Sequence, residues 1–320
     1  MLDKINEYIE KLPLEIEPKG LYEPIRYVLS LGGKRVRPML MMMTYEMWKE
    51  NGTDILPQAV ALETYHNFTL LHDDVMDKAD VRRGKPTVHK KWNENTAILS
   101  GDNMLVLAFQ WMMNMDKEQK VQKAVMDVFT QTAIEIGHGQ QYDVDFETRN
   151  DVTEDEYMEM IRLKTSVLLA CATKIGALMA GASKEDTENM YHFGEYMGLA
   201  FQLQDDYLDV FGDPKVFGKE IGGDILNNKK TYMLINALLK AQGDDKEALE
   251  KWINATTFDK AEKIAAVTAL YVKLGIDKMA KEKMDEYYKK AIQAIDKVSV
   301  DEKRKHTLRS YAAKMMKREK

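Results

Sequence analysis

Apolar residues recur at helical spacing along nearly the whole chain, whereas the strict alternation of a β-strand is hardly visible. Short segments rich in glycine, proline and asparagine interrupt this pattern. It predicts helices over residues 21–31, 38–50, 58–78, 95–114, 120–143, 155–180, 185–211 and 229–241, with several further amphipathic helices between about 246 and 318. No low-complexity linker divides the chain, so one all-α domain over residues 1–320 is favoured over two.

The composition agrees with a helical globular protein. Of the 320 residues 45% are hydrophobic, and only 18 are glycine and 7 proline. The single cysteine, Cys171, excludes an intrachain disulfide and suits a reducing compartment, so a cytoplasmic location is expected. The N-terminal segment lacks the apolar core of a secretory signal, and no apolar stretch approaches the length of a membrane span, so none is expected.

The net charge of −6 speaks against broad binding of nucleic acids. A negatively charged protein that acts on an anionic substrate must gather its cations locally or use the charge of a metal ion.

Two aspartate motifs lie within otherwise apolar helical segments. The first contains Asp73, Asp74 and Asp77, of which Asp73 and Asp77 are one helical turn apart. The second places Gln202, Asp205, Asp206 and Asp209 on one helix face at i, i+3, i+4 and i+7. Oxygen ligands without a nearby histidine or cysteine cluster favour Mg²⁺ over zinc. One such motif alone is more often a solvated helix face, but two of them predict a metal site.

Basic segments with glycines accompany both motifs. Gly32–Pro38 (GGKRVRP) combines close backbone approach with three cations, and Arg82, Arg83 and Lys85 follow the first aspartate motif. Gly218-Lys219 and Lys229-Lys230 follow the second. An acidic cluster followed by a basic loop, occurring twice, suits a diphosphate bridged by metal ions.

These segments together resemble the trans-polyprenyl diphosphate synthase family, which includes farnesyl and geranylgeranyl diphosphate synthases. The similarity extends over nearly the whole chain. It is carried by GGKRVRP at 32–38, HNFTLLHDDVMD at 66–77, VRRGKPTVH at 81–89, GHGQQYDVD at 137–145, KT at 164–165, FQLQDDYLDVFGD at 201–213 and GKEIGGDILNNKKT at 218–231.

The resemblance implies a bundle of ten or more helices around a deep central pocket, the isoprenoid synthase type I fold, and a homodimer. It implies that the aspartate motifs face each other across the mouth of the pocket and bind three Mg²⁺ ions, for which Mn²⁺ can substitute. Asp73, Asp77 and Asp205 would be direct ligands, and Asp74, Asp206 and Asp209 would complete the carboxylate shell directly or through water.

The resemblance also assigns the substrate contacts. Isopentenyl diphosphate would be held by Lys34, Arg37, His66 and Arg83, and the allylic diphosphate by Arg82, Lys164, Lys219 and Lys229. Thr165 and Gln202 would lie beside the reacting carbons, whereas Gln140 and Asp143 are expected to give structural support. The basic tail Lys314–Lys320 could close over the site, although an exposed terminus is the default expectation.

Three alternative functions are less well supported by these residues. A class I terpene cyclase would lack GGKRVRP and carry a different second metal motif, and a non-catalytic regulatory subunit would have lost aspartates or arginines that are present here. A helical interaction protein with accidental acidic clusters would not match all of the motifs together.

The length of the product depends on the residues before the first aspartate motif. Phe68 lies five residues before Asp73, about 7.5 Å along a helix, where its ring would stop a growing chain. The smaller Thr69 lies four residues before Asp73. This pattern resembles that of microbial geranylgeranyl synthases, so a C20 product is expected, with C15 as the alternative.

Overall fold

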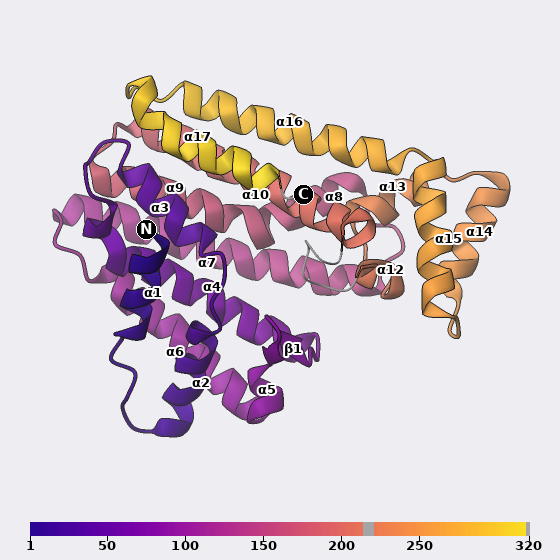
Figure 1. The fold of residues 1–320 in the computed structure, drawn as a ribbon, viewed down its shortest axis with the longest axis horizontal. Coiled ribbons are helices and arrows are strands. Elements are labelled where there is room, and N and C mark those ends of the chain that lie inside the picture. Colours follow the sequence, from indigo (N-terminus) through magenta and orange to yellow (C-terminus); the bar gives the residue numbers. More distant parts are fainter. Residues whose placement is uncertain (214–220, 318–320) are drawn as a thin grey trace. The chain divides into compact units, whose positions relative to one another are not determined.

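Helices account for nearly all of the regular structure in the computed structural model, which describes residues 1–213 and 221–317 (Figure 1). The chain divides into two units, each of which is described by itself. Unit 1 comprises Met1–Phe129 and Ala172–Thr187, and unit 2 comprises Thr130–Cys171 and Glu188–Lys320. The predicted all-α class is confirmed, while a single domain over residues 1–320 stays a prediction.

Unit 1 is built on a buried helix, α4, which contacts the first three helices and α6. Its elements are α1 (Leu2–Glu10), α2 (Lys19–Ser30), α3 (Val36–Tyr45), η1 (Gly52–Ile55), α4 (Leu56–Met76), β1 (Val81–Arg82), β2 (Lys85–Pro86), α5 (Val88–Lys91) and α6 (Glu94–Met113), with residues 119–129, 172–180 and 184–187 of α7 (Gln119–Thr148), α9 (Val167–Ala180) and α10 (Lys184–Phe211).

The packing of α4 explains why a charged motif can lie at its end. Residues 59–62 have no exposed surface, so burial of apolar area on several sides holds the helix in place. The helix ends at Met76, and Asp77 is its C-cap. The first aspartate motif therefore lies at the C-terminal end of a buried core helix.

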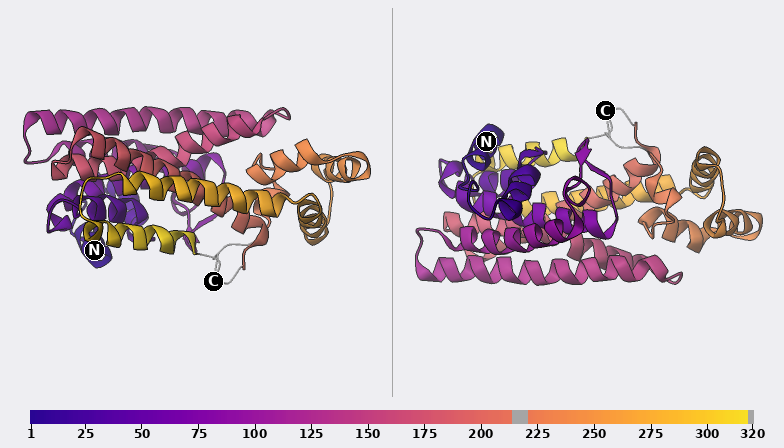
Figure 2. Two further views of the ribbon diagram at one scale, coloured as in Figure 1. Left: turned by 90° about the horizontal axis from the view of Figure 1, so that it is seen from above. Right: turned by 90° about the horizontal axis from the view of Figure 1, so that it is seen from below.

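Unit 2 contains the rest of α7, α9 and α10 and all of the C-terminal helices. The further elements are α8 (Glu154–Ile161), the π-helical segment η2 (Arg162–Ser166), α12 (Gly223–Leu226), α13 (Tyr232–Lys240), α14 (Gly243–Asn254), α15 (Lys260–Lys273), α16 (Ile276–Asp296) and α17 (Glu302–Met316). Within this unit α14 packs on α15, and α16 and α17 run alongside each other (Figure 2).

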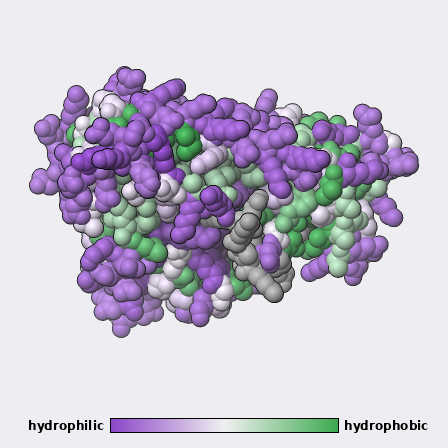
Figure 3. Space-filling model, turned by 45° about the horizontal axis from the view of Figure 1, so that its top comes forward, coloured by the Kyte–Doolittle hydropathy of each residue, from purple (hydrophilic) through white to green (hydrophobic). Residues whose placement is uncertain are grey.

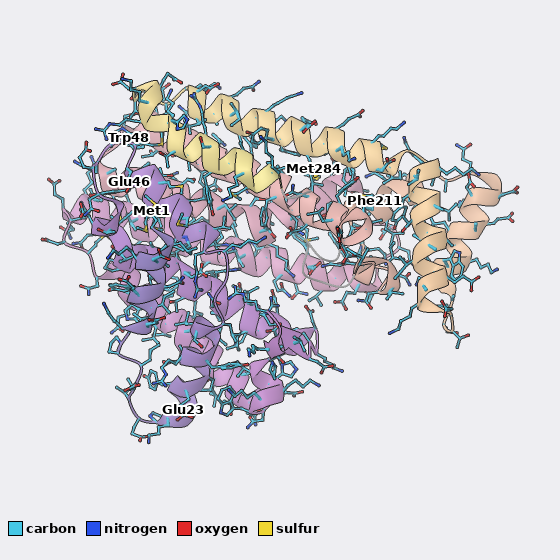
Figure 4. The ribbon with its side chains drawn as sticks, viewed as in Figure 1. Met1, Glu23, Glu46, Trp48, Phe211 and Met284 are labelled. Carbon is cyan, nitrogen blue, oxygen red and sulfur yellow. The ribbon has the colours of Figure 1, made fainter. Side chains whose placement is uncertain are left out.

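The core of unit 2 joins α8, α10, α13 and α16. Buried side chains such as Tyr157, Leu203 and Met284 belong to one cluster, against which Phe211 packs from the end of α10 (Figure 4). Hydrophilic side chains cover most of the surface drawn in Figure 3, with apolar ones in smaller patches. The second aspartate motif thus also lies on a core helix.

The predicted helices correspond to observed ones, with local differences. The segment predicted over 38–50 ends as a helix at Tyr45, and the segment over 120–143 continues to Thr148. The run predicted over 155–180 is interrupted by η2, and α1 was not predicted from the sequence. The helical spacing of apolar residues and the glycine- and proline-rich breaks locate the helices, but the ends of the helices depend on tertiary packing.

One helical run, Glu154–Ala180, is long and apolar enough by composition to cross a membrane. Since 78% of its most apolar window is buried inside the protein, it has the burial of a core helix. This is weak evidence for a span, and the expected absence of one stays a prediction.

Candidate active site

The first aspartate motif presents its three carboxylates to different surroundings. Asp73 is half-buried and Asp77 exposed, whereas Asp74 is only 5% exposed. Arg82 donates from Nε to both carboxylate oxygens of Asp74, at 2.8 and 2.9 Å. Arg82 Nη2 lies 2.7 Å from Asp74 Oδ1. This bidentate ion pair joins α4 to the β1–β2 hairpin.

The hairpin also contacts the glycine-rich basic loop. Arg83 and Gly84 both have positive φ, 52° and 73°, the backbone geometry of a tight two-residue hairpin turn. The Arg83 guanidinium donates to the carbonyl oxygen of Gly32. A Cβ atom on Gly33 would lie 2.9 Å from Arg83 Cζ, which is the end of a flexible side chain, and the φ of 133° at Gly33 favours glycine at this position.

His66 lies among these cations and is held neutral. Burial first, and then the charges of Arg37, Arg83, Arg82 and Arg35, lower the pKa of the imidazole well below its usual value. A neutral ring among guanidinium groups can bind an anion without adding another charge to the cluster. The structure thus brings together His66, Arg37 and Arg83, which were predicted to hold one diphosphate, and Lys34 is exposed on the same loop.

Arg35 differs from its cationic neighbours. Its side chain is buried, 2.8 Å from Glu63 Oε1, and donates to the carbonyl oxygen of Leu29 at 2.7 Å and to Asn6 at 3.2 Å. It therefore anchors the basic loop to three helices. In the sequence, Arg35 was grouped with the other cations of the loop, because no local pattern distinguishes an arginine that forms a buried ion pair from one that binds a substrate.

Phe68 belongs to a row of aromatic rings in unit 1. Its ring centroid lies 5.5 Å from that of Tyr65 and 4.9 Å from that of His72, and Phe129 lies 5.4 Å from Tyr65. Phe109 of α6 continues the row, 4.7 Å from Phe129. These contacts fix the Phe68 ring one to two turns before Asp73.

In unit 2, Asp206 is the buried member of the second motif. Tyr157 donates its hydroxyl to one carboxylate oxygen, and Gln202 Nε2 lies 3.1 Å from the other. Burial, followed by the charge of Asp224, raises the pKa of Asp206 to about 7. Asp205 and Asp209 are half-buried, and the Asp224 amide donates to Asp209 Oδ2 at 2.9 Å.

The lysine and threonine of the KT pair lie on η2. Lys164 Nζ is 2.6 Å from Asp143 Oδ2, and the Thr165 hydroxyl lies 3.0 Å from Gln202 Oε1. Burial acts to raise the pKa of Asp143, but the charges of Lys229 and Lys164 together lower it. Asp143 therefore stays ionised under the charge of these two cations, which were both predicted to bind the allylic diphosphate.

The aspartate oxygens have the right chemistry for Mg²⁺. Asp73 and Asp77 end α4, and Asp205 and Asp209 lie one turn apart on α10. Among the described residues, no three His, Cys, Asp or Glu side chains converge into a complete metal-binding group. Each motif thus offers a partial set of hard oxygen ligands, which oxygens of a bound diphosphate could complete.

Some of the residues predicted to belong to the site cannot be placed in it. Lys219 and the last three residues of the basic tail lie outside the described residues. The end of α17 contacts α10, where Gln204 Nε2 donates to the Met316 carbonyl oxygen at 2.9 Å. Sequence reasoning missed Tyr157 and Asp224 as partners of the second motif. The apposition of the two motifs stays a prediction.

The chain is similar to several prenyl diphosphate synthases. A sequence model of the family "Polyprenyl synthetase" matches residues 18–271. The geranylgeranyl diphosphate synthase of Methanosarcina mazei is 45% identical over 236 residues, which cover 74% of this chain and 73% of that protein. The geranylfarnesyl diphosphate synthase of Natronomonas pharaonis is 38% identical over 77% of this chain and 76% of its own.

A solved structure, a geranylgeranyl pyrophosphate synthase, matches with a TM-score of 0.93 and 42% identity over 100% of this chain and 99% of that chain. The geranylgeranyl pyrophosphate synthetase of Pyrococcus horikoshii matches with a TM-score of 0.91 and 33% identity over 98% and 95%.

Proposed function

The chain belongs to the polyprenyl synthetase family, and from this premise we propose that it condenses allylic diphosphates with isopentenyl diphosphate to give mainly geranylgeranyl diphosphate. Dimethylallyl, geranyl and farnesyl diphosphates would be the successive allylic substrates. The observation that carries the proposal is that each aspartate motif has a cluster of cations in its own unit. The charges of Arg37, Arg82 and Arg83 act on His66 in unit 1, and those of Lys164 and Lys229 act on Asp143 in unit 2.

The side chains of the chain itself would bind and orient the two substrates. We assign Lys34, Arg37, His66 and Arg83 to isopentenyl diphosphate, and Arg82, Lys164 and Lys229 to the allylic diphosphate, with Lys219 as a further candidate. Cations on the departing diphosphate stabilise the charge that develops as the allylic carbon–oxygen bond breaks. Thr165 and Gln202, which hydrogen-bond each other, would line the space beside the allylic cation.

Asp73, Asp77, Asp205 and Asp209 would hold the metal ions, with Asp74 and Asp206 supporting them from inside the protein. Bound Mg²⁺ would neutralise negative charge on the leaving diphosphate. We expect three ions, with Mn²⁺ as a substitute. The isopentenyl double bond then attacks the allylic cation, and the released diphosphate takes up the proton that is lost, so no protein base is required.

The direct test is release of diphosphate from dimethylallyl and isopentenyl diphosphates, with Mg²⁺ and with a chelator. The proposal requires turnover that stops with the chelator and returns with Mg²⁺. Cyclisation of an allylic diphosphate without consumption of isopentenyl diphosphate would instead identify a terpene cyclase. Absence of turnover of either kind would indicate a non-catalytic member of the family.

The proposed C20 length rests on Phe68 and its aromatic neighbours. Tyr65 and His72 hold the Phe68 ring on two sides, so the ring is a fixed obstacle and not a mobile one. Phe68→Ala should lengthen the products to C25 and beyond, while Thr69→Phe should shorten them toward C15. Chromatography of the products measures both changes. An unchanged distribution in Phe68→Ala would refute this floor, and C15 is the alternative for the unaltered enzyme.

We also propose a homodimer that forms through α6. Leu99, Val106 and Met113 are 60%, 64% and 60% exposed and are spaced by seven residues, so they form an apolar stripe along one side of this helix. Light scattering at micromolar concentration should give twice the 36.9 kDa mass of the chain. Val106→Lys should shift this mass toward the monomer. A monomeric unaltered protein would contradict the proposal.

A cytoplasmic location is proposed as well. Cys171 is buried as a free thiol, which fits a reducing compartment.

A further inference from the structure

The segment that carries Lys164 and Thr165 has an unusual backbone. Residues Arg162–Ser166 form a π-helical turn between α8 and α9. Such turns insert an extra residue into an α-helix, are seldom stable by themselves and occur frequently at functional sites. The surrounding structure must therefore favour this conformation over a regular helix.

Two glycines on neighbouring helices lie against this backbone. A Cβ atom on Gly139 of α7 would meet the backbone nitrogen of Lys164 and lie 2.8 Å from its Cα. A Cβ atom on Gly198 of α10 would lie 2.5 Å from Ser166 Cα and 2.7 Å from its Cβ. Atoms of folded proteins do not approach a Cβ so closely, so only glycine allows both helices to reach the π-turn.

One turn after each glycine, a polar side chain binds the same segment. Asp143, four residues after Gly139, accepts a hydrogen bond from Lys164 Nζ at 2.6 Å. Gln202, four residues after Gly198, accepts one from the Thr165 hydroxyl at 3.0 Å. Residues four apart share a helix face. Each of the two helices therefore makes two contacts with the π-turn. Its glycine lies against the backbone of the turn, and its polar side chain hydrogen-bonds a side chain of the turn.

We propose that Gly139, Asp143 and Gly198 are positioning residues, which hold the π-turn so that Lys164 and Thr165 have the geometry required for catalysis. This inference rests on the proposed function. Asp143 and Gly139 fix the lysine that would bind the allylic diphosphate, and Gly198 fixes the backbone next to the threonine beside the reacting carbons. Catalytic groups tolerate displacements of only about 0.5 Å, and a methyl group at either glycine would require a larger shift, of about 1 Å.

The experiment compares Gly139→Ala and Gly198→Ala with Gly137→Ala, a matched control on the same helix α7. Among the described residues, no atom lies within 4 Å of a Cβ atom at Gly137. For each protein the kcat, the KM for geranyl diphosphate, the KM for isopentenyl diphosphate and the thermal midpoint are measured with Mg²⁺. The kcat is normalised to the folded fraction from circular dichroism.

Gly139→Ala should raise the KM for geranyl diphosphate about tenfold and leave the KM for isopentenyl diphosphate within about twofold, because it displaces Lys164. Gly198→Ala should lower the normalised kcat by about 100-fold, the effect of a displacement of about 1 Å. Gly137→Ala should match the unaltered enzyme. A purely structural role would change the folded fraction and the thermal midpoint without changing either KM or the normalised kcat.

A second substitution tests the contact at Gly198 directly. Replacing Ser166 by glycine removes the Cβ and Oγ atoms that the new methyl group would meet at 2.7 and 2.9 Å. Because the contact with Ser166 Cα at 2.5 Å remains, the double variant Gly198→Ala/Ser166→Gly should recover only part of the lost kcat, by at least about threefold. A normalised kcat of folded Gly198→Ala within about twofold of that of the unaltered enzyme would overturn the assignment of Gly198.

Asp143→Glu serves if Gly139→Ala does not fold. It keeps the charge but moves the carboxylate by one methylene group, so the KM for geranyl diphosphate should rise about fivefold if the position of Lys164 matters. Asp145→Glu, an exposed position on the same helix, is the control. Equal KM values in the two variants would overturn the proposal, whereas an inactive unaltered enzyme would instead overturn the proposed function.

Discussion

The two aspartate motifs have similar spacing, but their buried members are bound in different ways. Asp74 of unit 1 forms a bidentate ion pair with Arg82, which comes from a surface hairpin eight residues later. Asp206 of unit 2 accepts hydrogen bonds from the neutral groups of Tyr157 and Gln202. In the first contact the partner of the carboxylate is a cation, whereas in the second both hydrogen-bond donors are neutral and the charge of Lys229 also acts on Asp206.

The difference follows from the surroundings of each motif. The end of α4 lies beside a hairpin rich in arginine, whereas Asp206 faces the core helix α8 and the charge of Asp224. A cation bound to Asp74 is also close enough to contribute to a diphosphate site, whereas Tyr157 and Gln202 bring no charge. The two motifs can thus provide similar metal ligands, while the contacts that support their buried aspartates differ in their contribution to stability and in their dependence on salt.

The largest effect is expected from the more accessible carboxylates. Asp73→Ala and Asp205→Ala should each lower kcat by about 100- to 1,000-fold, because each removes a charge that acts on the leaving group through the metal. Asp127→Ala, an exposed position on α7 paired with Lys123, is the control. Steady-state kinetics at saturating Mg²⁺ measures the change. Near-normal turnover in either variant would contradict the metal assignment for that motif.

The second prediction separates the cations of the two units. Arg83→Ala should raise the KM for isopentenyl diphosphate by about tenfold or more, and Lys229→Ala that for the allylic substrate, because each loses a charge-assisted contact worth about 1.5–3 kcal/mol. Lys90→Ala, whose ammonium group pairs with Asp80 at 2.8 Å, should change neither constant. Equal increases of both constants in both variants would show that the units do not divide the substrates in this way.

The third prediction compares the contacts to the two buried aspartates. Arg82→Met leaves the Asp74 carboxylate buried without its cation and should lower the free energy of unfolding by about 2–3 kcal/mol, less than for a fully buried pair because Arg82 is partly exposed. Tyr157→Phe removes one neutral donor and should cost about 1 kcal/mol.

Urea denaturation followed by circular dichroism gives both values. A cost for Tyr157→Phe that equals or exceeds that for Arg82→Met would reverse the comparison between the two motifs.

The sequence predicted the helices and the paired aspartates because both follow local rules. The helical period places Asp73 and Asp77 one turn apart, and apolar residues around them indicate a core helix. The contact between Asp206 and Tyr157 joins residues 49 apart in the sequence, and no local pattern indicates it. The π-turn at Lys164 also lies in a run whose composition suits a regular helix, and it becomes explicable only with Gly139 and Gly198 from other helices.

The smallest effect is expected at the start of α8, the helix that carries Tyr157. Thr153 caps this helix and forms a capping box with Glu156, which also pairs with Arg149 at 2.8 Å. These contacts, the Arg149 hydrogen bonds first, lower the pKa of Glu156 from 4.5 to about 2. Because the folded-state pKa lies below that of the unfolded chain, the contribution to stability is present above pH 4.5 and is lost as the pH falls through about 2.

Glu156→Gln should therefore lower the thermal midpoint by a few degrees or less at pH 6, with the difference shrinking as the pH is lowered toward 2. Melting curves of both proteins between pH 2.5 and 6 measure this difference, and Glu147→Gln, an exposed position near the end of α7, serves as the comparison. A difference that is constant over the whole range would mean that the charge of Glu156 does not stabilise the helix. The amide would then satisfy the cap as well as the carboxylate, and the support of Tyr157 would rest on packing alone.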